Sequence, residues 1–87
     1  MYDLDYWRRE NQLFLDAFQD PATSEVTLDF LLRGLGHVAR LTIKCHPEHQ
    51  QTVALDLQTS LDVARSRVGA TWMVEHTDSL LQHLLSM

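Results

Sequence analysis

Apolar side chains recur every three or four residues along most of this chain, which is the spacing of one face of an α-helix. Four segments show this period, at about residues 3–19, 24–44, 47–68 and 71–85. No alternating run of apolar and polar residues has both turn chemistry and a partner run, so strand signals are weak. We therefore predict an all-α fold, a small antiparallel bundle of three to four helices in one domain.

The breaks between these segments carry residues that commonly end or begin helices. Pro21 disfavours helical geometry at the residue before it, and Thr23 or Ser24 can then cap the next helix. Pro47 suits the first position of the third helix, where its missing N–H is no loss. Gly69 is typical of the residue just past a helix C-terminus. The apolar row of the third segment meets polar residues beyond Gly69, which favours two helices there over one continuous helix.

The second segment is apolar over more than half of its circumference. A helix of this kind lies at the centre of a domain or forms half of a subunit interface. A chain of 87 residues buries only about 60% of its unfolded surface, so a monomer would be marginally stable. We therefore predict a homodimer, or a tight complex with a different protein. The residues expected in a dimer interface or in the core are Phe30, Leu35, Leu41, Trp72, Leu81 and Leu85.

Composition and charge narrow the class of protein. The chain has twelve acidic and seven basic residues, for a net charge of −5. This balance makes nucleic acid a poor candidate partner, because phosphate binding needs a basic footprint. The sequence shows neither a signal-peptide pattern nor an apolar run near the roughly 18 residues of a membrane span. With its single cysteine, the chain is predicted to be cytoplasmic and not bound to a membrane.

Positive charge is concentrated in the second helix. Residues 30–46 hold three bases and no acid, whereas acids outnumber bases on either side. Asp29, Arg33, His37, Arg40 and Lys44 follow one face of that helix at spacings of four, four, three and four, so this row is mostly cationic. We call its four basic members, from Arg33 to Lys44, the basic stripe. The stripe predicts docking of an acidic partner. One alternative is structural: the stripe pairs with the acidic first segment or only keeps its side of the helix solvated. The other alternative is a nucleic-acid-binding regulator that uses Arg33, Arg40 and Lys44.

An aromatic cluster near the start of the chain is a second candidate for partner binding. Tyr2 and Tyr6 lie on a different side of the first helix from Trp7, together with Arg9. Aromatic side chains and arginine are the usual anchors of protein interfaces. The alternative is that the tyrosines only hold down a partly buried terminus.

The stretch "IKCHPEHQQ" contains the only cysteine and two of the five histidines. Cys45, His46 and His49 suggest a metal-dependent helical protein as a further alternative. Their spacing does not match a zinc site, which wants about four ligands, and Pro47 separates His46 from the helix of His49. We therefore expect a buried, unreactive Cys45, no metal and no cofactor.

No motif in the sequence indicates catalysis. The G-x-G of "RGLGH" lacks a third glycine and a preceding strand, so it does not predict a phosphate loop. We therefore predict that the chain is not an enzyme. The expected function is that of a small regulatory or adaptor protein, of the anti-activator, inhibitor or co-chaperone type, which occludes a protein partner through apolar helix faces. The candidate partner-binding residues are Tyr2, Tyr6, Arg9, Arg33, Arg40 and Lys44.

Overall fold

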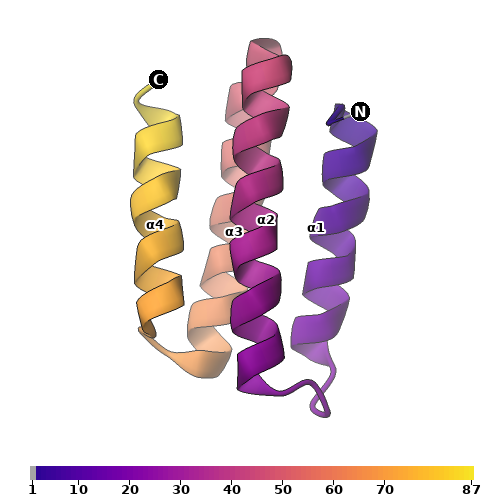
Figure 1. The fold of residues 1–87 in the computed structure, drawn as a ribbon, viewed down its shortest axis with the longest axis vertical. Coiled ribbons are helices and arrows are strands. Elements are labelled where there is room, and N and C mark those ends of the chain that lie inside the picture. The colour runs from indigo at the N-terminus through magenta and orange to yellow at the C-terminus, as the bar shows by residue number, and fades with distance from the viewer. Residues whose placement is uncertain (1) are drawn as a thin grey trace.

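Four α-helices and one 3-10 turn make up the computed structural model, which describes residues 2–87 (Figure 1). The elements are α1 Leu4–Gln19, α2 Glu25–Cys45, η1 Pro47–His49, α3 Gln50–Val68 and α4 Trp72–Leu85. The predicted all-α bundle is confirmed. At the start of the third helix, Pro47 opens the 3-10 turn η1 and α3 follows it. None of the helices in residues 2–87 is long and apolar enough to cross a membrane.

The helices run alternately in opposite directions, so both ends of the chain lie at the same end of the bundle (Figure 1). Helices α2 and α3 occupy the centre, with α1 on one side and α4 on the other. The bundle is therefore flat, with Cα extents of 35 × 23 × 16 Å. Helix α2 packs against all three other helices, in agreement with the prediction that so apolar a helix lies at the centre of a domain.

Side-chain caps begin three of the helices. The Asp3 carboxylate accepts the Tyr6 N–H at 2.8 Å, and this bond lowers the pKa of Asp3. A group whose pKa is lowered by folding adds stability above its unfolded pKa, and that stability is lost as the pH falls through the folded pKa. Ser24 and Thr71 cap α2 and α4 in the same way. Ser24, one of the two cap candidates in the sequence, therefore begins a real helix.

All four helices contribute to one apolar core. Trp7 of α1 is fully buried, and the α3 row has a buried residue at each turn up to Ala64. Every buried polar side-chain atom of residues 2–87 has a hydrogen-bond partner. The buried apolar residues are Trp7, Phe14, Phe18, Leu28, Leu32, Leu35, Ala39, Ile43, Val53, Ala54, Leu57, Leu61, Ala64, Met73, Val74, Leu81 and Leu84.

Polar pairs fix the register between α1 and α3. The Trp7 indole N–H donates to the Asp56 carboxylate at 3.0 Å, and the Ser60 hydroxyl donates to the Asn11 side-chain oxygen. Both pairs join residues 49 positions apart. The sequence separation is the same for both pairs, so moving one turn along α1 corresponds to moving one turn in the same direction along α3. The two helices therefore run parallel.

A third contact with the same offset lies at the far end of the two helices. The Arg67 guanidinium donates to the carbonyl oxygen of Phe18, which is also 49 positions away. It donates as well to the carbonyls of Asp20 and Thr23, each at 3.0 Å. Arg67 therefore binds carbonyl groups that the end of α1 leaves without helical partners, and it anchors the α1–α2 loop to α3.

Two glycines in α2 have different surroundings. A Cβ atom on Gly36 would lie 3.0 Å from Cδ2 of Leu80, so this glycine lets α2 and α4 approach closely. A Cβ atom on Gly34 would meet no atom within 4 Å. Gly36 therefore has a packing role, whereas Gly34 leaves an open surface on the helix.

The Gly34→Ala variant is expected to be more stable than the natural chain by about 1 kcal/mol, because alanine costs less conformational entropy in a helix interior. Urea unfolding followed by circular dichroism measures the difference. Gly36→Ala is the matched comparison, and its gain should be smaller because Leu80 must move. A loss of stability in Gly34→Ala would show that something packs on this part of α2.

Candidate partner-binding surface

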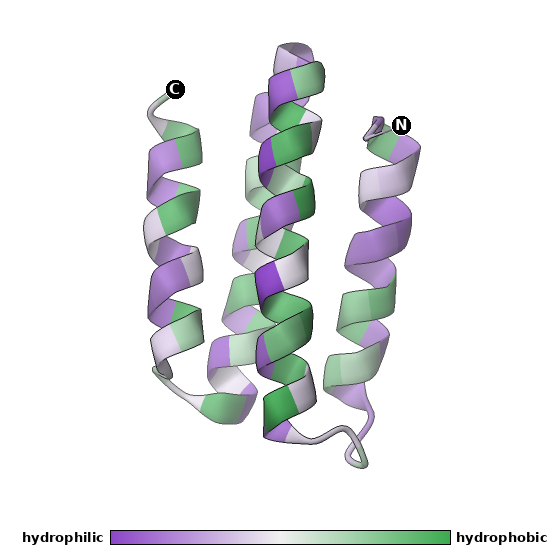
Figure 2. Ribbon diagram, viewed as in Figure 1, coloured by the Kyte–Doolittle hydropathy of each residue, from purple (hydrophilic) through white to green (hydrophobic). Residues whose placement is uncertain are grey.

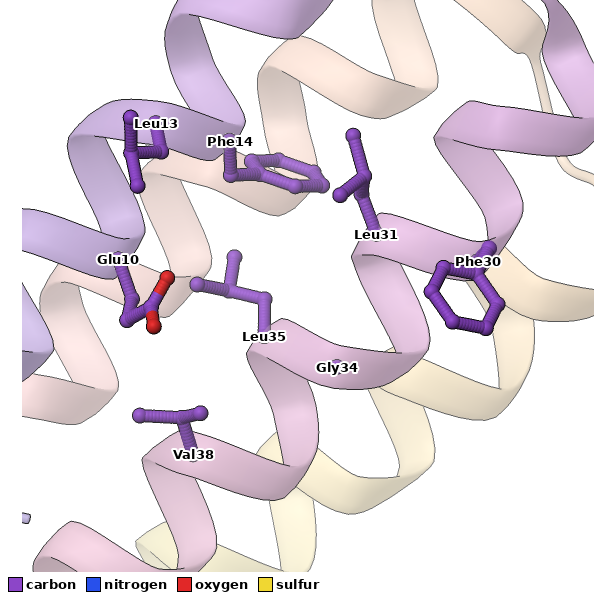
Figure 3. Close-up of a pocket in the computed structure, with 8 residues that line it drawn as sticks. All are labelled: Glu10, Leu13, Phe14, Phe30, Leu31, Gly34, Leu35 and Val38. Carbon is purple, nitrogen blue, oxygen red and sulfur yellow. The ribbon is translucent and has the colours of Figure 1, made fainter.

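An open groove of ≈ 230 Å³ runs between α1 and α2 (Figure 3). Side chains of α1 project from one wall toward Leu31, Leu35 and Val38 on the other. Gly34 leaves bare backbone in the α2 wall, and Phe30 stands at the edge of the groove. The residues that line it are Glu10, Leu13, Phe14, Phe30, Leu31, Gly34, Leu35 and Val38. We call this hollow the apolar groove.

The rim of the apolar groove exposes large side chains that the core does not need. Leu13 is 59% exposed and Phe30 is 73% exposed, while Phe14 and Leu35 beneath them are buried. Among the described residues, Glu10 is the only charged one that lines the groove. Its carboxylate interacts with the Tyr6 hydroxyl, and this raises the pKa of Tyr6. The candidate anchor Tyr6 therefore lies beside the groove without lining it.

A second hollow, of ≈ 200 Å³, lies on the other side of α2, against α4. Arg33, His37 and Arg40 of the basic stripe line it, and α4 adds His76. Sequence reasoning did not assign His76 to this site, because helical period does not tell which turns of two helices face each other. The remaining lining residues are Gly36, Thr77 and Leu80. We call this the α2/α4 hollow.

The two hollows are connected across the exposed side of α2. A third hollow between them is lined by Phe30, Arg33, Gly34 and His37. Apolar and basic side chains therefore adjoin on one helix, and Figure 2 shows hydrophobic and hydrophilic residues side by side along the visible turns of α2. A ligand that crossed α2 would meet both kinds of side chain.

Carboxylates of residues 2–87 do not neutralise the basic stripe. Among residues 2–87, the ion pairs within 4.0 Å are His46–Glu48, Arg65–Asp62 and Arg65–Asp78. None of them includes a residue of the stripe, so pairing with the acidic first segment is not seen. Arg33, Arg40 and Lys44 are exposed, and their charge is available to a partner.

The aromatic cluster lies apart from the hollow that Arg33 and Arg40 line. The rings of Tyr2 and Tyr6 pack edge to face, 5.6 Å apart, and both residues are half-buried at the start of α1. Arg9 is exposed on α1, and Lys44 is exposed on α2 outside the α2/α4 hollow. The six candidate residues therefore do not form one continuous site.

Some of the residues proposed for a dimer interface or the core are buried in the core, and the others lie on the surface. Leu35 and Leu81 are buried inside the chain, and Leu41 is half-buried. Phe30, Trp72 and Leu85 remain exposed. The excess of apolar surface is thus smaller than the sequence of the second segment predicts, because most of its leucines pack within one copy. The homodimer stays a prediction.

The structure contradicts the prediction that Cys45 is buried. Cys45 is exposed, not buried. It lies two residues after the buried Ile43, and at about 100° per residue this turns it away from the core. The rings of His46 and His49 lie 6.0 Å apart. The described part of the chain has no group of three or more histidine, cysteine or acidic residues arranged to hold a metal ion.

Comparison with family models, curated proteins and solved structures found no match for this chain. The surfaces of the bundle are therefore what supports a proposal. Two are distinctive: the apolar groove between α1 and α2, and the α2/α4 hollow with its basic lining.

Proposed function

We propose that this protein is a small non-enzymatic regulator that binds a protein partner and occludes its surface. The observation that carries the proposal is the apolar groove, with Leu13 and Phe30 exposed at its rim. Scattered exposed apolar residues are ordinary on a protein surface, whereas grouped ones mark interaction sites. The core closes beneath the groove without them, since Phe14 and Leu35 are already buried.

The chemistry beside the groove indicates the kind of partner. Arg33 and His37 border Phe30 and Gly34 in the connecting hollow, and the stripe has no ion pair with carboxylates of residues 2–87. The proposed partner is an amphipathic helix with an apolar face for the groove and acidic residues along one flank. An apolar helix face seated in a groove supplies affinity, and the charged flank selects orientation and raises the association rate.

A double variant, Leu13→Ala with Phe30→Ala, is expected to lose the partner while keeping its fold. Both side chains are exposed, so truncation removes binding area and leaves the core intact. Affinity capture from cells that contain the natural protein measures the loss, with circular dichroism to confirm unchanged melting. Loss of one apolar anchor at an interface commonly costs about 1–2 kcal/mol, so the retained amount of partner should fall about tenfold or more.

Leu55→Ala is the matched control, because Leu55 is an exposed leucine of α3 that lines neither hollow. It should capture the same partner as the natural chain. If the double variant captures that partner equally well, the apolar groove is not the docking surface. Light scattering on the pure protein tests the predicted homodimer: a dimer that the double variant dissociates would identify a second copy as the occupant of the groove in place of a different protein.

A further inference from the structure

The α2/α4 hollow brings together four nitrogen-rich side chains from two helices distant in sequence. Arg33, His37 and Arg40 come from three successive turns of α2, and His76 comes from α4. The close approach of the helices depends on Gly36, whose missing side chain makes room for Leu80. The packing of the bundle, not a sequence motif, therefore creates this arrangement.

We propose that the α2/α4 hollow binds the phosphoryl group of a phosphomonoester. Two guanidinium groups supply planar sets of N–H donors that match phosphate oxygens. The two imidazoles supply further N–H donors. Within residues 2–87, no carboxylate lines the hollow, so no acidic side chain in its lining competes with an anion. The inference does not depend on the proposed function of the apolar groove.

The charge of the hollow matches a phosphoryl group better than a carboxylate. Arg33 and Arg40 are permanently protonated, which gives two positive charges. A phosphomonoester carries about −1.5 to −2 at neutral pH and offers three acceptor oxygens. A carboxylate carries one negative charge and offers two oxygens. None of the ion pairs among residues 2–87 includes Arg33, Arg40 or the two histidines, so their charge and donors are free for a dianion.

The size of the hollow also limits the ligand. Its volume of ≈ 200 Å³ is below the roughly 300–1,000 Å³ of pockets that enclose a drug-sized molecule. A phosphoryl group fits, while the remainder of its carrier would extend into solvent. The site is therefore expected to recognise the phosphoryl group and to discriminate little between small carriers.

Trp72 supplies a signal for binding. Its indole is 69% exposed and stacks on the imidazole of His76, with ring centroids 5.0 Å apart and planes within 10°. A ligand that hydrogen-bonds His76 changes the environment of this ring pair. The other tryptophan, Trp7, is buried between α1 and α3 and should not respond.

The test is a titration of the full chain with inorganic phosphate and, separately, with O-phosphoserine, at fixed ionic strength. Trp72 fluorescence and calorimetry should both show saturable one-site binding, and acetate should bind about tenfold more weakly. Equal affinities for the two phosphate probes would identify the free ion as a sufficient ligand, whereas tighter phosphoserine binding would identify the ester. Either result supports the phosphoryl site.

Charge-matched variants distinguish a specific phosphate-binding site from non-specific attraction of phosphate to a basic surface. Arg40→Gln and His76→Gln should each lower phosphate affinity, with about a tenfold loss for Arg40→Gln. Lys44→Gln removes the same charge from the same helix outside the hollow, and it should change affinity less than about twofold if it acts only through screened surface charge. The Leu13→Ala and Phe30→Ala double variant should bind phosphate like the natural chain, which distinguishes this site from the apolar groove.

Three results would overturn the proposal. The first is a linear, non-saturating response to phosphate. The second is an equal loss of affinity in Lys44→Gln and Arg40→Gln, with none in His76→Gln, which would reduce the hollow to a diffuse basic surface. The third is salt-sensitive binding of a short DNA duplex that phosphate does not displace, which would favour a nucleic-acid-binding regulator.

Discussion

Replacing Leu57 with alanine is expected to lower the free energy of unfolding by about 2–5 kcal/mol, because the truncation leaves a cavity in the core. Leu57 is fully buried at 0% exposure and belongs to the α3 row that faces the other helices. A domain of this size has about 5–15 kcal/mol of stability in total, so the variant should be close to unfolding. Urea denaturation followed by circular dichroism measures the change.

Leu55→Ala is the control for this prediction. It makes the same chemical change two residues earlier on the same helix, at a side chain that is 66% exposed. The expected change is within about 0.5 kcal/mol, as for other surface substitutions. Equal losses in the two variants would contradict the helix phase described for α3, or would show that Leu55 is covered in an assembly.

Trp7→Phe is expected to cost about 2–4 kcal/mol, through two effects. The smaller ring leaves part of a fully buried site empty. It also removes the indole N–H that donates to Asp56 at 3.0 Å across the α1–α3 interface. Leaving a part-buried carboxylate without this donor carries a desolvation cost of about 1–3 kcal/mol. Chemical denaturation again gives the free energy.

A double-mutant cycle with Asp56→Ala separates the hydrogen bond from the lost ring volume. The two substitutions should be non-additive by about 1 kcal/mol, because each alone removes the same bond. Asp56→Asn keeps a side-chain oxygen acceptor and should lose less than Asp56→Ala. Strict additivity in the cycle would mean that this pair does not contribute to the register of α1 and α3.

Local signals in the sequence predicted the helices and most of their ends. Ser24 caps α2, and Gly69 follows α3 with a φ of 77°, a conformation that favours glycine. These signals are local because a cap or a stop depends on bonds within one turn of the chain. The start of α3 was the exception, since the 3-10 turn at Pro47 precedes it.

The candidate site was predicted less well than the helices. Arg33, His37 and Arg40 of the basic stripe line one hollow, because side-chain period within a helix is fixed by its geometry. Its neighbour His76 was missed, and Cys45 was wrongly expected to be buried. The place of His76 and the exposure of Cys45 both depend on which face of a helix packs against another helix. The local sequence of one segment does not determine that packing.

The sequence by itself determined four helices, the breaks between them and a second helix with apolar residues over more than half of its circumference. Only the tertiary structure decided which apolar residues of that helix close the core and which remain on its surface, as Leu35 and Phe30 illustrate. It also decided the parallel register of α1 and α3 and the meeting of Arg40 with His76 around one hollow. The physical reason is that helical period arises from bonds within one segment, whereas these contacts join segments tens of residues apart and depend on how whole helix faces pack.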